Sequence, residues 1–250
     1  MTDPKYEIVA NFEKYSIGID EVFAFKCRSC GKCCKNREDI LLNSRDVYNI
    51  ATALNLTHKQ VIEKYGDVYV GKDSRIPIVR LMPKGANMTC PLITGNRCSV
   101  HSLKPAVCAL FPIGRVVAAE DAPTDMGLGN DPNEIKYIYN GATCGSRKKK
   151  QTVRAWLDRF GIPIEDKFFI KWNEALFKLI AAIRKYEGKD GVTERAMDML
   201  WGGIFAALYV DYDTSQDFFP QFEANVTKIL GVFEKLEPLY EVIQAGQHDE

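Results

Sequence analysis

Four cysteines fall within eight residues near the start of the chain, in the order Cys27-Arg28-Ser29-Cys30-Gly31-Lys32-Cys33-Cys34. Four more follow in separate segments, and none lies beyond residue 144. A hydrophobic core does not need thiols at this density, whereas a metal site does, because thiolates are soft ligands that suit zinc and iron–sulfur clusters. The spacing therefore predicts a polycysteine metal site formed by Cys27, Cys30, Cys33, Cys34, Cys90, Cys98, Cys108 and Cys144.

The order C-x2-C-x2-C favours an iron–sulfur cluster over zinc but leaves both open. Bacterial iron–sulfur proteins use this run together with a remote cysteine that precedes proline, and here Cys90 is followed by Pro91. Zinc sites more often pair two C-x2-4-C knuckles, whereas this chain has one such set and then single cysteines. We therefore expect an iron–sulfur cluster, 4Fe-4S in type, as the cofactor, with zinc as the alternative.

The adjacent pair Cys33 and Cys34 raises the question of how many metal centres there are. Neighbouring side chains point about 100° apart in a helix and to opposite faces in a strand. Eight thiols divide into two four-thiolate sets that this pair would bridge, one set taking most of the first cluster plus one late cysteine. The alternative is a single cluster with spare thiols beside it, and the sequence does not assign the sets.

Several residues near the cysteines have simpler interpretations. Disulfides would pair eight cysteines, but a chain of this size in a reducing compartment rarely needs them, and Cys144 taken alone fits a buried core thiol. His101 is a further ligand candidate, although a histidine at such a position more often lies at the surface or beside the ligands. The run from Arg147 to Lys150 is predicted to be a solvated loop; the alternatives are that it binds an anion or offsets the charge of the metal site.

Composition limits the class of protein. With 250 residues, 46% hydrophobic, 26% charged and a formal net charge of +0, the chain resembles a soluble globular protein of one or two domains. Zero net charge gives no global field to recruit nucleic acid or a membrane surface, so we expect a protein or small-molecule partner instead. No apolar run approaches the roughly 20 residues of a membrane span. The first residues lack the features of a signal peptide, and we expect a cytoplasmic location.

The composition also changes along the chain, because all eight cysteines lie before residue 150 and all three tryptophans lie after it. We predict the α+β class. Residues 1–150 are expected to form a cysteine-cluster metal-binding domain of short strands and long loops. Residues 151–250 are expected to form an α-helical region packed on it.

Periodicity and capping signals give the expected elements. Thr57 to Gln60 fits a capping box, Ser44 fits an N-cap, and the proline in 76–82 suggests an edge strand. Pro105 is expected to begin a helical turn that presents Cys108. Strands are predicted at 22–25, 39–42, 76–82, 113–119 and 135–139, a loop at 120–134, and helices at 44–54, 57–65, 153–160, 168–183, 196–208 and 217–236, with a restart at Glu237-Pro238.

The cysteine pattern resembles that of a known family. Phe25 to Cys34 reads F-x-C-x2-C-G-x-C-C, Cys90 begins C-P-L, and residues 97–112 read R-C-S-V-H-S-L-K-P-A-V-C-A-L-F-P. These motifs are similar to those of the YkgJ-like cysteine-cluster family, which is described as zinc- or iron-chelating and includes the flagellin lysine N-methylase group. The likeness covers about residues 23–146, and all eight cysteines fall on family positions. Ala109 stands where the family often has arginine.

The resemblance implies a metal-dependent protein and leaves three functions open. The first is redox chemistry or electron transfer by an iron–sulfur oxidoreductase. The second is iron–sulfur-dependent protein lysine methylation, for which the sequence shows no glycine-rich nucleotide loop, since Gly127-Leu128-Gly129 is too short. The third is a zinc-stabilised interaction module without enzymatic activity. Whether the protein is an enzyme therefore stays open, and no residue is assigned a catalytic role.

Overall fold

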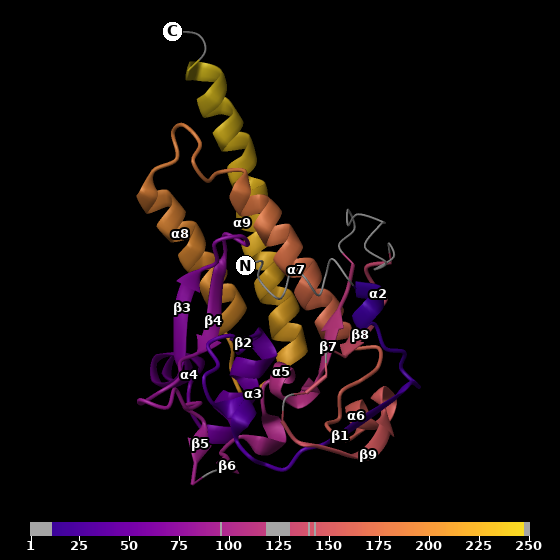
Figure 1. The fold of residues 1–250 in the computed structure, drawn as a ribbon. Helices are drawn as coiled ribbons and strands as arrows, with labels where there is room; N and C mark the ends of the chain where they lie inside the picture. Colours follow the sequence, from indigo (N-terminus) through magenta and orange to yellow (C-terminus); the bar gives the residue numbers. More distant parts are fainter. Residues whose placement is uncertain (1–11, 96, 119–130, 140, 143, 248–250) are drawn as a thin grey trace. The chain divides into compact units, whose positions relative to one another are not determined.

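The computed structural model describes residues 12–95, 97–118, 131–139, 141–142 and 144–247 (Figure 1). It has short strands in small sheets and long helices late in the chain, which confirms the α+β class. The chain divides into two compact units, each assembled from two stretches. The first unit is Met1–Arg37 with Pro83–Glu174, and the second is Glu38–Met82 with Ala175–Glu250. The chain thus passes between the units more than once, while a functional boundary at residue 150 stays a prediction.

The first unit contains three antiparallel strand pairs and short helices. The strand β1 (Val22–Lys26) pairs with β9 (Ser146–Thr152), β7 (Ile113–Val116) pairs with β8 (Lys136–Tyr139), and β5 (Ile93–Thr94) pairs with β6 (Arg97–Cys98). Its helices are α2 (Phe12–Tyr15), α5 (Ala106–Leu110), α6 (Val153–Asp158) and the first part of α7 (Lys167–Arg184). All eight cysteines belong to this unit.

The core of the first unit forms around one tryptophan. Phe23 and Phe25 alternate with exposed positions along β1, so both point inward and meet the ring of Trp156 edge-on at 6.0 and 5.6 Å. The Trp156 indole N–H donates to the carbonyl oxygen of Leu110 at 2.9 Å. This core therefore joins β1, α5 and α6, the elements that lie next to the cysteines in sequence.

A buried ion pair fixes the start of α7 in the same unit. Arg115 donates to Asp166 Oδ2 at 2.8 Å, and both side chains are almost wholly buried. The other oxygen of Asp166 accepts from the backbone N–H of Phe169 at 3.2 Å, and the Arg115 guanidinium lies 4.1 Å from the Phe169 ring centroid. Because a buried charge without its partner is costly, this pair holds β7 against the beginning of α7.

The second unit places a small sheet among helices. Its three strands run in the order β2 (Leu41–Leu42), β4 (Pro77–Leu81), β3 (Gly66–Val70), all antiparallel. Besides the second part of α7, its helices are α3 (Ser44–Leu54), α4 (His58–Tyr65), α8 (Glu194–Phe205) and α9 (Phe218–Gln247), with a π-helical turn at Ala206–Val210 after α8. In the part of the chain that the structure describes, no helix has the length and apolar character needed to cross a bilayer.

Most predicted elements are present, with several corrections. The Thr57–Gln60 capping box is confirmed, but α3 is capped by Asn43 rather than by Ser44, through a capping box with Asp46. The strand with Pro77 is central rather than at an edge, because proline at its first position leaves the rest of the ladder intact. The pairing strand β3 had not been predicted.

Two further corrections concern the basic run and the last helix. Arg147 to Lys150 form most of β9 rather than a loop, since β1 offers a partner strand for an otherwise weak strand former. The last helix continues through Pro238 instead of restarting there.

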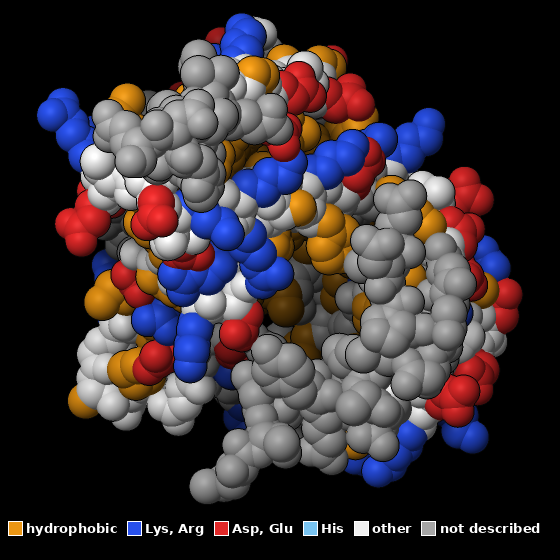
Figure 2. All heavy atoms as spheres, turned by 90° about the horizontal axis from the view of Figure 1, so that it is seen from above, with side chains coloured by type: hydrophobic (Ala, Val, Ile, Leu, Met, Phe, Trp, Pro, Cys, Tyr) orange, Lys and Arg blue, Asp and Glu red, His pale blue; other side chains and the backbone are white. Residues whose placement is uncertain are grey.

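Over the face seen in Figure 2, charged side chains of both signs lie among hydrophobic ones, as on an ordinary solvated surface.

The second unit buries a histidine among aromatic rings. His58 is 2% exposed, its ring stacks on Tyr212 at 5.3 Å and lies 5.8 Å from Tyr48, and its Nε2 has no hydrogen-bond partner among the described residues. Burial lowers the pKa of His58 from 6.5 to about 4. A lowered pKa means that the unfolded chain binds the proton first, so this site loses stability as the pH falls from 6.5 toward 4.

We predict that His58→Phe flattens this pH dependence, since phenylalanine keeps the ring packing and removes the titrating group. Between about pH 7 and pH 5 the wild type should lose about 2 kcal/mol more of its free energy of unfolding than the variant does. Urea unfolding followed by tryptophan fluorescence at both pH values measures the difference. Parallel losses in the two proteins would show that His58 ionises in the folded state without cost.

Candidate metal centre

The first cysteine run forms a tight loop after β1. The backbone is left-handed at Ser29 and Gly31, with φ of 52° and 68°, and then closes into a 3-10 turn over Lys32–Cys34. The amide of Ser29 donates to Cys27 Sγ at 3.4 Å, and the amide of Cys34 donates to the Gly31 oxygen at 3.0 Å. These turns keep four thiols at the surface of a short loop, where Cys27 and Cys30 are exposed.

The middle cysteines lie around the β5–β6 hairpin and α5. Cys98 ends β6 opposite Ile93, whose amide donates to the Cys90 oxygen at 3.1 Å, so the hairpin holds Cys90 and Cys98 near each other. Cys108 lies in α5, and its amide donates to the Pro105 oxygen at 2.9 Å. A bond of 2.7 Å from the Cys90 amide to the Cys34 oxygen connects this group to the first run.

Cys144 approaches the first run from the other side. Gly145 follows it with a φ of 76°, and its backbone N–H donates toward the Cys30 thiol. The backbone N–H of Lys32 and then that of Gly145 lower the pKa of Cys30. Ser146 pairs with Lys26 across the β1–β9 ladder. Strand pairing therefore delivers Cys144 to the loop of Cys27 and Cys30.

The adjacent pair Cys33 and Cys34 has sulfur atoms 3.9 Å apart. A hydrogen bond from Cys34 lowers the pKa of Cys33 to about 6, with further help from the charges of Lys104 and Arg37. The same bond, together with burial, raises the pKa of Cys34. The two sulfurs therefore differ in how readily each becomes the thiolate that a metal binds.

Mutual electrostatic effects show which thiols are neighbours. Burial raises the pKa of Cys144, and the next contributions come from the charges of Cys33, Cys30 and Cys27. Burial likewise raises the pKa of Cys90, which also feels Cys98 and Cys33. Cys34 feels Cys33, Cys90 and Cys108. Cys33 is therefore a neighbour of Cys144 as well as of Cys34 and Cys90, so these effects bring thiols of separate segments together without dividing them into sets.

The chemistry of these donors fits a thiophilic metal. Backbone N–H groups point at the sulfurs of Cys27 and Cys30, the kind of outer contact that orients and stabilises a ligating thiolate. Within the described residues, no three Cys, His, Asp or Glu side chains lie close enough to enclose a metal ion. The thiols are therefore gathered as neighbours and pairs, and His101 lies exposed in a 3-10 turn.

Sequence reasoning missed the backbone contribution to this site. Gly145 and the N–H groups of Ser29 and Lys32 carry no metal-binding side chain, so a search for ligands passes over them. A glycine directly after a cysteine, at Gly31 and again at Gly145, was the available signal, because left-handed turns let the chain double back on a thiol.

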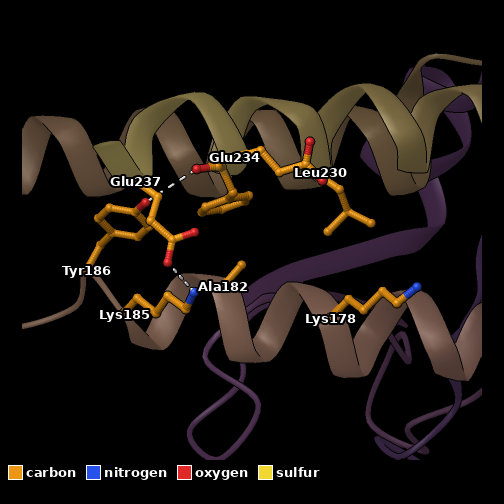
Figure 3. A pocket seen from close by; sticks show the side chains of 8 residues that line it. Lys178, Ala182, Lys185, Tyr186, Leu230, Glu234 and Glu237 are labelled. Atoms are coloured by element: carbon orange, nitrogen blue, oxygen red, sulfur yellow. Dashed lines mark hydrogen bonds and ion pairs between the residues drawn. The ribbon is translucent and has the colours of Figure 1, made fainter. Parts of the chain in front are cut away.

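A pocket of about 290 Å³ lies elsewhere, between α7 and α9 of the second unit (Figure 3). Lys185 bridges to Glu237 at 2.5 Å beside it, and the Tyr186 hydroxyl donates to the Phe233 oxygen at 3.4 Å. The pocket has no cysteine in its lining, and its apolar floor is formed by packed helix residues. It therefore belongs to the helix packing of this unit and not to the thiol groups.

Comparison with known proteins supports the reading of the thiols. Residues 26–145 match the model of the CxxCxxCC family, described as a putative zinc- or iron-chelating domain. This stretch is similar to the CxxCxxCC domain. The match confirms the resemblance stated from the motifs and supports metal binding by cysteines, with zinc and iron both permitted. No curated protein and no solved structure matches the chain.

Gly145 lies so close to β1 that a substitution there tests how the chain packs beside the first cysteine run. A Cβ at this position would lie 2.5 Å from the Phe25 ring and 2.8 Å from the Lys26 backbone oxygen. Gly141 has a similar φ of 71°, but a Cβ there meets nothing within 4 Å. The two glycines therefore share the conformational cost of substitution and differ only in the clash.

We predict that Gly145→Ala lowers the free energy of unfolding by about 2–4 kcal/mol, against about 1 kcal/mol for the control Gly141→Ala. The larger loss arises because the Lys26 backbone oxygen cannot give way without opening the β1–β9 ladder. Urea unfolding and metal content per chain are the measurements. Equal losses in the two variants would mean that the close approach of Gly145 to β1 does not matter.

Proposed function

We propose that the eight cysteines bind metal as two four-thiolate sets, that these sets hold iron–sulfur clusters, and that the protein transfers electrons. The observation that supports this best is the proximity of thiols from separate segments, since Cys144 feels the charges of Cys33, Cys30 and Cys27, and Cys34 feels those of Cys90 and Cys108. The division that we propose puts Cys27, Cys30, Cys33 and Cys144 in one set and Cys34, Cys90, Cys98 and Cys108 in the other. The adjacent pair contributes one thiol to each set. Such clusters form in reducing compartments, so this function fits a cytoplasmic protein.

The exposure of the first set favours a redox role over a purely structural one. Cys27 and Cys30 are exposed, whereas the other six thiols are half-buried. A cluster supplies one-electron chemistry when bound, and its potential depends on hydrogen bonds to the sulfurs and on solvent exposure. In this chain the amides of Ser29, Lys32 and Gly145 supply those hydrogen bonds. They stabilise negative charge on Cys27 and Cys30 and orient both thiols.

Zinc is the second candidate, and one distance favours it. Four sulfurs at about 2.3 Å from a tetrahedral zinc lie about 3.8 Å from one another. The 3.9 Å between Cys33 and Cys34 Sγ is close to that value, so the pair suits two ligands of a single ion. In that case the protein is a zinc-stabilised interaction module, and the metal maintains the loops without redox chemistry.

Lysine methylation receives less support. A methyltransferase needs a pocket for the methyl donor beside the reacting group. The pocket described between α7 and α9 is lined by Lys178, Lys185, Glu234 and Glu237 among others, and contains no cysteine. No observation on the thiol groups points to a methyl donor.

We expect protein purified without oxygen to contain iron and acid-labile sulfide, with visible absorption that bleaches on reduction. The spacing and the exposed first set are the reasons for this expectation. Iron, zinc and sulfide analysis per chain is the measurement. A colourless protein with stoichiometric zinc and no sulfide would replace the iron–sulfur proposal by the zinc module.

Cysteine-to-serine variants test the two sets independently of the metal's identity. Cys33→Ser and Cys27→Ser should each lose the same centre, and Cys34→Ser and Cys108→Ser the other, because each pair shares a set. Combining Cys27→Ser with Cys33→Ser should therefore cost no further metal, whereas Cys33→Ser with Cys34→Ser should remove both centres. Metal per chain is the readout.

If the wild type binds one centre, and either Cys33→Ser or Cys34→Ser leaves the metal content per chain unchanged, the protein holds a single cluster with spare thiols.

A further inference from the structure

The zero net charge of the chain conceals a strong separation of charge. The three stretches that contain the cysteines, residues 22–37, 83–118 and 141–157, include fourteen lysines and arginines and not one aspartate or glutamate. The rest of the chain carries nineteen lysines and arginines against all thirty-three acidic residues. The fourteen are Lys26, Arg28, Lys32, Lys35, Arg37, Lys84, Arg97, Lys104, Arg115, Arg147, Lys148, Lys149, Lys150 and Arg154.

Most of these cations point into solvent beside the thiols. We call the exposed ones without an ion pair to any described residue the basic surface: Lys26, Arg28, Lys32, Lys35, Arg97, Arg147, Lys148, Lys149 and Lys150. The β1–β9 ladder sets Lys26 opposite Ser146 and Ala24 opposite Lys150, so the run on β9 lies along β1. Lys32 and Arg97 are neighbours of Cys33 and Cys98 in sequence.

The metal site does not neutralise this charge. A zinc ion with four thiolates leaves a formal charge of about −2, so two such centres leave about −4 against the nine cations of the basic surface. Lysines on an exposed edge strand prevent it from pairing with other chains, and this role can explain only the run on β9. It does not explain Lys26, Arg28, Lys32, Lys35 and Arg97, which lie off that strand. A surplus of positive charge therefore remains around the thiols whichever metal they bind.

The exposed apolar residues of the first unit suit a protein partner better than a nucleic acid. The large hydrophobic side chains exposed among its described residues are Val22, Leu103 and Val107, all aliphatic. Single-stranded nucleic acid is held by exposed aromatic rings on which the bases stack, and no Phe, Tyr or Trp side chain in the described part of this unit is exposed. A protein–protein interface combines apolar side chains with a polar rim and does not need rings for base stacking.

We propose that the basic surface docks an acidic protein, which presents its carboxylates to Lys26, Arg28, Lys32 and Arg147 to Lys150 beside the exposed thiols Cys27 and Cys30. This goes beyond the proposed function, since charge complementarity steers and orients the partner whichever metal is present. If the iron–sulfur proposal also holds, the same docking brings a redox partner to the exposed thiol set.

The test measures binding and uses no redox readout, so its failure is distinct from failure of the iron–sulfur proposal. Fluorescent poly-L-glutamate is titrated with the metal-loaded full-length protein, and anisotropy gives the dissociation constant. The variant Lys148→Glu with Lys149→Glu reverses two charges on β9. The control, Lys228→Glu with Lys235→Glu, makes the same charge change at exposed positions of α9.

We expect the β9 variant to bind poly-L-glutamate about tenfold more weakly than wild type, because each reversed charge adds repulsion of the order of a surface ion pair. The control should bind as wild type does. Thermal unfolding and metal content identify a variant that fails to fold, in which case Lys148→Gln with Lys149→Gln should give about a threefold loss.

Two comparison probes separate other anions from an acidic protein: an oligothymidylate of equal charge, and phosphatidylserine vesicles. At about 150 mM salt, where surface charges are screened beyond about 8 Å, poly-L-glutamate should bind more tightly than either. The proposal is overturned if poly-L-glutamate fails to bind, if the β9 and α9 variants weaken binding equally, or if the oligonucleotide or vesicle binds best.

Discussion

The first unit depends on holding eight thiols close together, and that proximity is costly unless something compensates for it. The hydrogen bond with Cys33 and then burial raise the pKa of Cys34, and burial together with the charge of neighbouring sulfurs raises the pKa values of Cys90 and Cys144. Backbone N–H groups lower that of Cys30, and the Cys34 thiol lowers that of Cys33. Full ionisation of the group therefore requires a cation in place of the protons. A metal that binds thiolates supplies it, and metal binding then becomes part of the folding free energy.

The same constraint explains why the three stretches that contain the cysteines, residues 22–37, 83–118 and 141–157, carry no aspartate or glutamate. An aspartate among thiolates would add like charge at short range, which raises the cost of every ionised sulfur. Lys104 and Arg37 act in the opposite sense on Cys33. The other cations are exposed to solvent and make the basic surface positively charged, which a partner of opposite charge can recognise. Metal chelation and the charge of the surface thus follow from one electrostatic requirement.

The second unit is held together by ordinary packing. Its sheet, β2-β4-β3, lies in the same compact unit as α3, α4, α8 and α9, and its buried polar groups find local partners. Ser44 donates to the Leu208 carbonyl, and Tyr48 donates to the Gln216 carbonyl at 2.7 Å. Two exceptions are Ser74 Oγ and His58 Nε2, which are buried without a partner among the described residues, and the histidine makes this unit sensitive to acid. The first unit, in contrast, combines a packed core around Trp156 with thiols near its surface.

The sequence alone indicated metal binding by cysteines and predicted most of the regular structure. The spacing C-x2-C-x2-C-C, the capping box from Thr57 to Gln60 and the helical periodicity after Thr152 were sufficient, because each depends on residues close together in the chain. The approach of Cys144 to Cys30 came from the tertiary structure, since the pairing of β1 with β9 brings these two segments together. The same pairing made Arg147 to Lys150 a strand, and β3 made Pro77 central, because long-range partners override weak local preferences.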